Sequence, residues 1–249
     1  MLRQAVFFIT YVERSVVMVG TLINTIAIIM GTALGLLLRK GIPDRLRDTV
    51  VQGQGLCVIL IGLSGALKSA DTLCVIICTV VGGLIGAAVN IEKRLDDLGA
   101  FLERKVSGGK GEKGSIAKGF VTASLVFCVG AMAIVGAMDS GLRGDHSTLI
   151  AKSALDGIFA IFFAGSLGVG VGLSAVAVFL YQGAFALLGM WIEPLLTEAI
   201  ITEMSAVGGL LIAGIGLNMI YDKHHIPVGN LLPAIFMPML YIPLTGLFV

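Results

Sequence analysis

Long apolar stretches alternate with short polar ones along the whole chain. A helix needs about 20 predominantly apolar residues to cross the hydrocarbon core of a membrane. Eight stretches have close to this length: 16–38, 50–67, 73–91, 120–138, 149–170, 171–190, 204–221 and 228–248. The pattern therefore predicts an all-α, polytopic transmembrane helix bundle of about eight spans.

One boundary stays open, because residues 165–172 alternate glycine with serine, leucine and valine. Such a segment can form a tight turn between two spans or a weak, close-packed helix. The alternative to eight spans is seven spans plus a re-entrant segment.

Composition supports the membrane class and excludes several others. The 249 residues are 57% apolar and 13% charged, whereas a soluble domain has about a quarter charged residues. The four cysteines lie within apolar stretches, which excludes a disulfide-stapled secreted module. The net charge of +1 gives no field that would attract nucleic acid. The expected surroundings are the lipid bilayer, with no nucleic-acid partner.

Basic residues predict the orientation. Of the 17 Lys and Arg, four lie in 39–47 and seven in 92–118, two connections that are two spans apart and so share a side. The positive-inside rule places both in the cytoplasm and both termini outside. Apolar residues at helical spacing after Ile91 predict an amphipathic helix on the inner surface, followed by a Gly/Lys linker over 107–115.

The domain organisation is simple. Glu13 and Arg14 interrupt the first apolar run, and Met18 opens a clean span. We therefore expect residues 1–17 to be an N-terminal extension that need not be native. Residues 18–249 are expected to form a single transmembrane domain with the amphipathic loop 92–118.

Small residues recur at spacings that favour close helix packing. G-x-x-x-G pairs occur at Gly31/Gly35, Gly82/Gly86 and Gly168/Gly172, and other spans are studded with glycine throughout. In a membrane such residues let helix backbones approach one another. The alternation of the two helix types fits an internal repeat like those of secondary transporters; ordinary helix packing explains it as well.

Asp156 is the strongest candidate for chemistry. It lies about 10 Å along the fifth span at about 1.5 Å per residue, and Lys152 precedes it by four residues on the same helix face. An ionisable group within a span costs about 2.5–3.5 kcal/mol on insertion scales and normally faces a cavity or a partner. The pair is either a coupling pair that binds a cation or a proton, or a structural ion pair near the outer headgroups.

Amide side chains at depth are further candidates for a solute or ion pathway. They are Asn24, Gln52, Gln54, Asn218 and Asn230. Hydrogen bonds between neighbouring helices are the alternative role for such residues. Pro233, Pro238 and Pro243 are expected to bend the last span, and broken helices in transporters expose carbonyls to ions.

Signals for catalysis or a cofactor are missing from the sequence. It holds no H-E-x-x-H, no C-x-x-C and no Walker motif. Cys74 and Cys78 stand four residues apart, and two thiols alone make a poor metal site. We expect no catalytic residue, no metal and no cofactor, and hence no enzyme.

Several short motifs together resemble the YdfK/YqgA family of bacterial inner-membrane proteins. They are MVGTLINT at 18–25, GTALG at 31–35, RKGIP at 39–43, QGQG at 52–55, SGLRGD at 140–145 and AKSALDG at 151–157. The resemblance runs from about Met18 to the C-terminus. It implies a bacterial or archaeal cytoplasmic membrane and a family of unknown function whose members are supposed to be transporters.

The expected function is therefore a secondary transporter or permease for a small solute or ion, with Asp156 and Lys152 as the coupling or gating pair. Two alternatives stay open. One is a scaffold or regulatory subunit whose basic inner loop docks anionic lipid or protein. The other is an ion channel built as a homo-oligomer.

Overall fold

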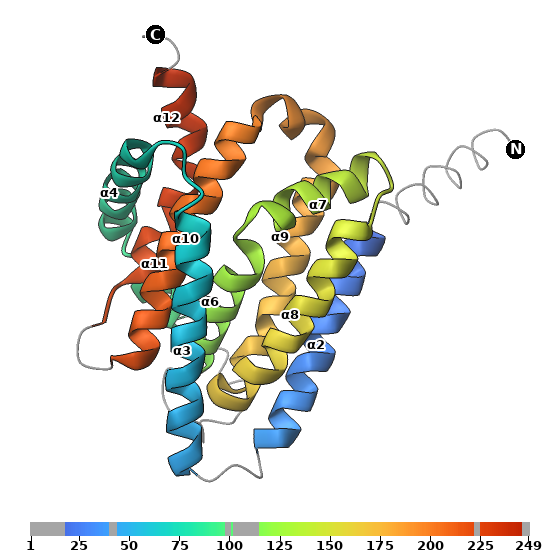
Figure 1. Ribbon diagram of the computed structural model, residues 1–249, viewed down its shortest axis with the longest axis vertical. Helices are drawn as coiled ribbons and strands as arrows, with labels where there is room; N and C mark the ends of the chain where they lie inside the picture. Colours follow the sequence, from blue (N-terminus) through green and yellow to red (C-terminus); the bar gives the residue numbers. More distant parts are fainter. Residues whose placement is uncertain (1–17, 40–43, 98–100, 102–114, 222–224, 246–249) are drawn as a thin grey trace, which may run out of the picture.

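The computed structural model describes residues 18–39, 44–97, 101, 115–221 and 225–245, and every regular element within these ranges is helical. The predicted all-α bundle is thus confirmed (Figure 1). The α-helices are α2 (Val19–Arg39), α3 (Asp44–Ala66), α4 (Thr72–Val89), α6 (Ser115–Cys128), α7 (Ala131–Leu142), α8 (Ser147–Leu167), α9 (Gly170–Ile192), α10 (Glu198–Ile220), α11 (Val228–Leu231) and α12 (Pro238–Thr245). Two 3₁₀ segments, η1 (Glu193–Leu195) and η2 (Leu232–Phe236), complete these elements.

Six described helices are long and apolar enough to cross a membrane, and two bent pairs raise the number to as many as eight. The predicted fourth span, 120–138, is not straight. It consists of most of α6 and most of α7, which meet at an angle of 64°. The cause is Gly130, whose φ of +118° is a conformation that L side chains rarely adopt. The last span is also bent, by 41°, before Pro238.

The glycine-rich segment 165–172 forms a tight turn. Gly168, with φ +83°, ends α8, and α9 begins at Gly170. The predicted Gly168/Gly172 pair therefore flanks a turn rather than lying on one helix face. Elsewhere α10 begins six residues before the predicted seventh span, because the Thr197 side chain accepts a hydrogen bond from the amide of Ile200 and caps the helix there.

The helices form two halves. In the α2 half, α2 packs along α8, and α9 packs on both α2 and the bent pair α6–α7; in the α3 half, α3 packs along α10, and α4 packs against α11 and η2 (Figure 1). Each half thus contains one long helix pair, one further long helix and one bent segment. The two halves meet along a seam where contacts, mainly of α6 with α10 and of α3 with α8, are far sparser than within either half.

Glycines set the spacing inside each half. A Cβ on Gly31 or Gly35 of α2 would lie 2.3 or 2.2 Å from a backbone oxygen of α8. In the α3 half, a Cβ on Gly86 of α4 would lie 1.9 Å from the carbonyl oxygen of Asn230. The backbones therefore touch where these glycines stand, as close packing in a membrane requires.

The surface of the bundle fits a bilayer around it. Large apolar side chains point outward along α2, α3, α4, α8 and α9, among them Leu37, Leu60, Leu84, Phe162 and Leu180. An apolar surface of this extent would be unfavourable in water. In contrast, α10 is largely enclosed by the other helices.

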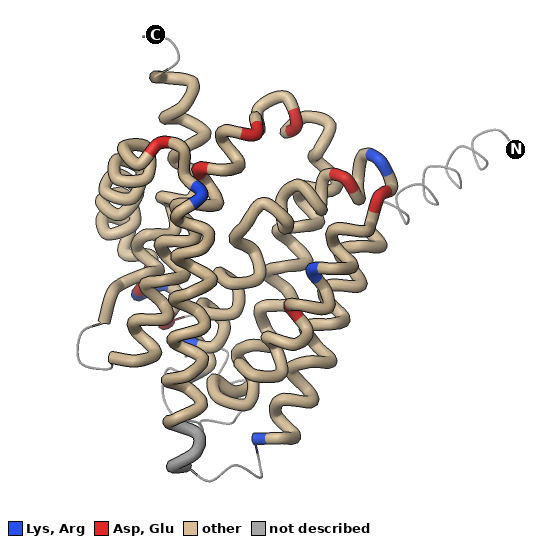
Figure 2. The backbone as a smooth tube through the Cα atoms, viewed as in Figure 1, with Lys and Arg blue, Asp and Glu red and all other residues tan. Residues whose placement is uncertain are grey.

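Charged side chains concentrate toward the two ends of the bundle (Figure 2). We call the end with the α3–α4, α7–α8 and α9–α10 connections the acidic end; its carboxylates include Asp71, Asp139, Asp145, Glu193 and Glu198. The opposite end, where α2 ends at Arg39 and α6 carries Lys118, is the basic end. The predicted extension 1–17 and most of the linker 107–115 lie outside the described residues.

Two parts of the chain differ from expectation in how they are buried. Glu203, which lies just outside the predicted seventh span 204–221, is 3% exposed in α10. Its carboxylate accepts hydrogen bonds from Ser69 Oγ and from the amides of Ala70 and Asp71. Residues 91–97 are helical as predicted, but their half-buried face approaches Gly229 of α11 through Glu92 and Leu95.

Candidate functional site

Lys152 and Asp156 form a buried ion pair on α8. The Nζ of Lys152 lies 2.8 and 2.7 Å from the two carboxylate oxygens of Asp156, and the two residues are 6% and 4% exposed. Because α8 begins at Ser147, Asp156 stands about 14 Å along a helix of about 31 Å. The pair therefore lies near the middle of the helix, deeper than the sequence led us to expect.

Two amides from other helices extend this pair. Asn24 of α2 donates from Nδ2 to Asp156 Oδ2 at 2.9 Å and to Gln182 Oε1 of α9 at 3.3 Å. Both amide residues are 0% exposed. We call Asn24, Lys152, Asp156 and Gln182 the buried polar cluster; it joins three helices of the α2 half.

The buried polar cluster is not fully satisfied. Asn24 Oδ1 and Gln182 Nε2, one acceptor and one donor, have no hydrogen-bond partner among the described residues, and neither has Thr21 Oγ1 on the same face of α2. A buried polar group left without a partner costs about 1–3 kcal/mol. Such groups are expected where a ligand, an ion or ordered water is held.

Apolar side chains close the cluster on the side of the basic end. Ile28 lies one turn beyond Asn24 on α2, and Val178 lies one turn before Gln182 on α9; both are fully buried. Because α2 and α9 run in opposite directions, both residues stand on the same side of the cluster. The polar groups of the cluster are thus separated from the basic end by an apolar layer.

The two bent segments meet beside the cluster. An apolar pocket of about 160 Å³ on the seam is lined by Cys128 and Val129 at the α6–α7 bend, by Leu232 and Phe236 near the bend before α12, and by Tyr181 of α9. Tyr181 directly precedes Gln182. Cys128 is close enough to Lys152 and Asp156 to interact with their charges.

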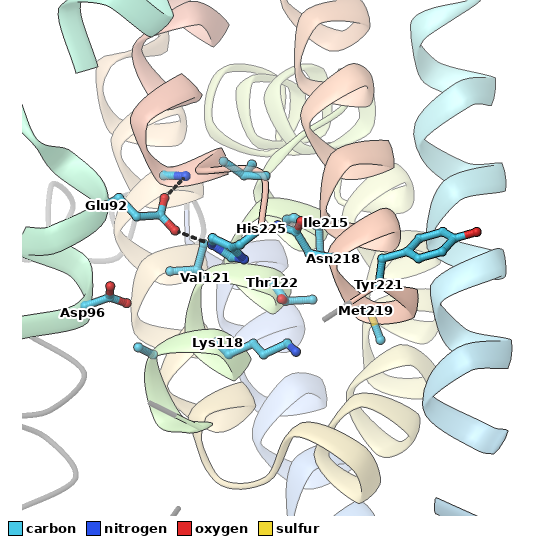
Figure 3. Close-up of a pocket in the computed structure, with 13 residues that line it drawn as sticks. Glu92, Asp96, Lys118, Val121, Thr122, Ile215, Asn218, Met219, Tyr221 and His225 are labelled. Carbon is cyan, nitrogen blue, oxygen red and sulfur yellow. Dashed lines mark hydrogen bonds and ion pairs between the residues drawn. The ribbon is translucent and has the colours of Figure 1, made fainter. Parts of the chain in front are cut away.

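A polar pocket of about 230 Å³, the end pocket, opens on the seam near the basic end (Figure 3). Glu92 and Asp96 lie on one side and Lys118 of α6 on another. Glu92 accepts hydrogen bonds from the Gly229 amide at 2.6 Å and is paired with His225 Nε2 at 2.9 Å. Burial, and after it the charge of Glu92, raises the pKa of Asp96.

The candidate residues from the sequence fall into three groups. Asn24, Lys152 and Asp156 come together in the buried polar cluster. Asn218, which lines the end pocket, exchanges hydrogen bonds with the backbone of Ile226, and the Asn230 side chain accepts one from the Glu92 amide.

The remaining two candidates lie on α3. Gln54 crosses the seam, where it donates to the carbonyl of Phe162 and accepts from Ser166 Oγ. Gln52 is exposed on α3 and joins neither group.

Gln182 is the functional candidate that sequence reasoning missed. It lies in the predicted span 171–190, which is otherwise strongly apolar, and it is the one Asn or Gln in that span. A single amide in the middle of an apolar span is the signal that would have found it.

Metal ligands are not grouped in the described part of the chain, where no set of three or more His, Cys, Asp or Glu could hold an ion. Cys74 and Cys78 are buried with their sulfurs 3.7 Å apart. They pack in the apolar core of the α3 half.

Comparison with known proteins identifies the family. The model of a family described as "Protein of unknown function (DUF554)" matches residues 19–243. This chain belongs to the DUF554 family. Relatives named YdfK and YqgA confirm the resemblance found in the sequence.

Two similar proteins illustrate the relationship. The "Uncharacterized membrane protein YdfK" of Bacillus subtilis (strain 168) is 32% identical over 225 residues, which cover 89% of this chain and 94% of that protein. The "Uncharacterized protein YqgA" of Escherichia coli (strain K12) is 34% identical over 223 residues, with the same coverage of 89% and 94%. No solved structure matches the chain. The relationship and the apolar helices identify a membrane protein of a family whose function is not established.

Proposed function

We propose that this DUF554 protein is a secondary transporter or permease for a small solute or ion. The observation that carries the proposal is the buried polar cluster. A charged pair costs free energy in an apolar bundle, even when its partners are well placed. Intramembrane ionisable groups are typically retained where they bind a substrate, an ion or a proton.

The arrangement in two halves supports the same function. Many transporters work by rocking one bundle of helices against another around a central site, and broken helices commonly contribute to that site. Here the α2 half and the α3 half meet along a sparse seam, and a bent segment from each lines the apolar pocket beside Tyr181.

Orientation and energy source complete the proposal. The charge distribution predicts the basic end in the cytoplasm and the acidic end outside, in the cytoplasmic membrane of a bacterium or archaeon. Since the sequence has no Walker motif, the energy would come from a gradient of an ion or proton or from a separate ATPase partner; the buried charged pair favours the gradient. Asp156 and Lys152 would couple the gradient to the movement of the halves, and Asn24 and Gln182 would hold that pair in place.

The test is transport by the purified protein in proteoliposomes. Currents on a solid-supported membrane would be recorded on exchange into inorganic cations, inorganic anions, amino acids, dicarboxylates or sugars, each with and without a pH gradient. We expect the wild type to respond to at least one of these classes and Asp156→Asn to lose that response.

A control and two contrary outcomes sharpen the test. Glu193→Gln changes an exposed carboxylate at the acidic end and should transport like the wild type. The proposal fails if the wild type responds to no class of probe, or if Asp156→Asn transports at the wild-type rate. Stepwise single-channel currents in planar bilayers would show that the protein is an oligomeric channel and not a transporter.

A further inference from the structure

A line of polar groups leads from the acidic end toward the buried polar cluster. It begins at His146, the residue before α8, which is half-buried. The Nδ1 of His146 lies 2.7 Å from the Oγ of Ser140 on α7. Ser140 is completely buried, so a side chain at the surface is hydrogen-bonded to a hydroxyl inside the bundle.

The line continues from Ser140 to α2. The Oγ of Ser140 lies against Gly20, where an added Cβ would be only 3.0 Å from it. Thr21 follows Gly20, is completely buried, and its Oγ1 has no partner among the described residues. Asn24, which is bonded to Asp156, lies one turn further along the same face.

Side-chain packing does not explain why residue 21 is a threonine, because its buried hydroxyl makes no hydrogen bond to the described residues. Valine has nearly the same shape and would remove an unsatisfied buried polar atom, which otherwise costs about 1–3 kcal/mol. Ordered waters buried in proteins make about three hydrogen bonds, typically to polar groups that have no other partner. A water bound to Thr21 Oγ1 and Asn24 Oδ1 would satisfy both atoms and join the hydroxyl to the cluster.

The line ends at the cluster. Ile28 and Val178 close it on the side of the basic end, and the next polar side chain on this face of α2 is Thr32, beyond Ile28. Along this face of α2, the polar groups next to the cluster therefore lie on the side of the acidic end.

The ligand that fits this arrangement is a proton. The carboxylate of Asp156 already accepts hydrogen bonds from the ammonium of Lys152 and from the amide of Asn24. A metal cation would have to displace the ammonium and would meet no group of three carboxylate, thiol or imidazole ligands among the described residues. A proton adds to one carboxylate oxygen and requires neither change.

We propose that Asp156 is the proton-binding site of the transporter and that protons reach it from the acidic end by way of His146, Ser140 and Thr21. This inference rests on the proposed function and names its coupled ion. Each hydroxyl in the line accepts one proton and passes on another, and the water beside Asn24 gives its proton to a carboxylate oxygen of Asp156 and regains one from Thr21. The Asn24 amide holds this water and the carboxylate in place and carries no proton itself, so all relay groups are unchanged after a transfer. Asp156 ends as a neutral carboxylic acid, and Lys152 keeps its charge but loses its ionic partner.

Charged and titratable side chains lie close to both ends of the line, Asp156 and His146. Asp156 is faced by Lys152 on its own helix and by Cys128 of α6. His146 follows Asp145. Arg143, the residue after α7, is paired with Asp139 of α7 and with Glu193. Lys152 is therefore the group whose charge changes its environment most when Asp156 takes up a proton.

The experiment follows protonation of Asp156 directly. The full chain in lipid nanodiscs would be exposed to protons released by a light flash from a caged acid, and the C=O stretching band of the protonated carboxyl would be recorded by time-resolved infrared spectroscopy. Asp156→Asn should delete the band and so assign it. Thr21→Val should slow the rise of the band by about tenfold or more, with an unchanged midpoint in an equilibrium pH titration.

Matched variants separate the route from a merely structural role. Thr21→Ser keeps a hydroxyl and should restore the wild-type rate. Thr32→Val removes an equally buried and unpartnered hydroxyl of α2 beyond Ile28 and should leave the rate unchanged. Ser140→Ala changes a different helix and should slow the rise of the band as Thr21→Val does. It takes the place of Thr21→Val if Thr21→Val fails to fold.

Contrary results are well defined. The inference is overturned if acidification produces no band that Asp156→Asn removes, if Thr21→Val keeps the wild-type rate, or if Thr32→Val slows protonation to the same extent. None of these measurements uses a transported solute. Protonation by this route without any transport would refute the proposed function alone, and transport without protonation of Asp156 would refute the proton route alone.

Discussion

Gly62 of α3 and Gly209 of α10 face each other so closely that neither position has room for a side chain. A Cβ on Gly62 would lie 2.6 Å from the carbonyl oxygen of Gly209, and a Cβ on Gly209 would lie 2.6 Å from that of Gly62. This reciprocal contact holds together the long helix pair of the α3 half. Since lipid gives helices no hydrophobic reason to associate, dispersion contacts between such backbones stabilise the pair.

Gly62→Ala should therefore destabilise the protein. The added methyl group would lie 2.4 Å from the backbone nitrogen of Ala213, so the helices must separate, at a cost of about 1–3 kcal/mol. Gly53→Ala on the same helix is the control, because a Cβ there meets nothing within 4 Å. It should be neutral or stabilise by up to about 1 kcal/mol through helix propensity. Unfolding in mixed detergent micelles measures both, and equal effects would contradict the role of the contact.

The ion pair of α8 predicts a strongly non-additive pair of substitutions. Lys152→Met leaves a buried carboxylate without its ionic partner, which typically costs about 3–5 kcal/mol. The double variant Lys152→Met/Asp156→Leu removes both charges and should recover most of that stability, while transport stays lost. A double-mutant cycle of unfolding free energies, completed with Asp156→Leu, gives the coupling. Additive effects would show that the two charges do not depend on each other.

Glu203 predicts a local effect at the connection between α3 and α4. Its carboxylate accepts hydrogen bonds from one hydroxyl and two backbone amides. Glu203→Gln replaces one acceptor oxygen by an NH₂ group, which faces hydrogen-bond donors and cannot accept from them. This should reduce the free energy of unfolding by about 1–3 kcal/mol. Hydrogen exchange at Ala70 and Asp71 should accelerate in this variant. Glu198→Gln, an exposed change on the same helix, should alter stability by no more than about 0.5 kcal/mol and leave this exchange unchanged.

Asp96 predicts a pH dependence at the end pocket. Burial and the charge of Glu92 raise the pKa of Asp96 in the folded protein, so its ionised form is disfavoured there relative to the unfolded chain. The resulting loss of stability sets in as pH rises above the unfolded pKa of about 3.9 and is complete above the folded pKa. Asp96→Asn should thus raise the thermal midpoint at pH 7 and have little effect at pH 3.5. Asp97→Asn, next to it and outside the lining of the end pocket, is the control; a larger gain for Asp96→Asn at low pH would contradict the assignment.

The sequence predicted a polytopic helix bundle and the order of its apolar segments, because each helix satisfies its own backbone hydrogen bonds and must be apolar over a length fixed by the bilayer. The predicted eight spans are the upper end of the six to eight that the described helices allow. It did not predict the bend at Gly130. A glycine in an apolar run is compatible with a straight span, and only the fold shows that this one adopts a positive φ.

Part of the buried polar cluster could be predicted from the sequence and part could not. Lys152 and Asp156 are four residues apart, so helix geometry alone places them together. Asn24 stands 132 positions from Asp156 and 158 positions from Gln182, the two residues to which its side chain donates. Gln182 carries no signal beyond being an amide in an apolar span, so its place in the cluster could not be read from spacing.

The amino-acid sequence by itself determined that this is a helical membrane protein of the DUF554 family with a charged pair inside one span. Apolar length and local spacing are properties of single helices, and they are written in consecutive residues. Only the tertiary structure decided which helices pair, where the two halves meet and which polar groups share an apolar interior. Those outcomes depend on backbone approach and side-chain packing between residues that are far apart in the chain.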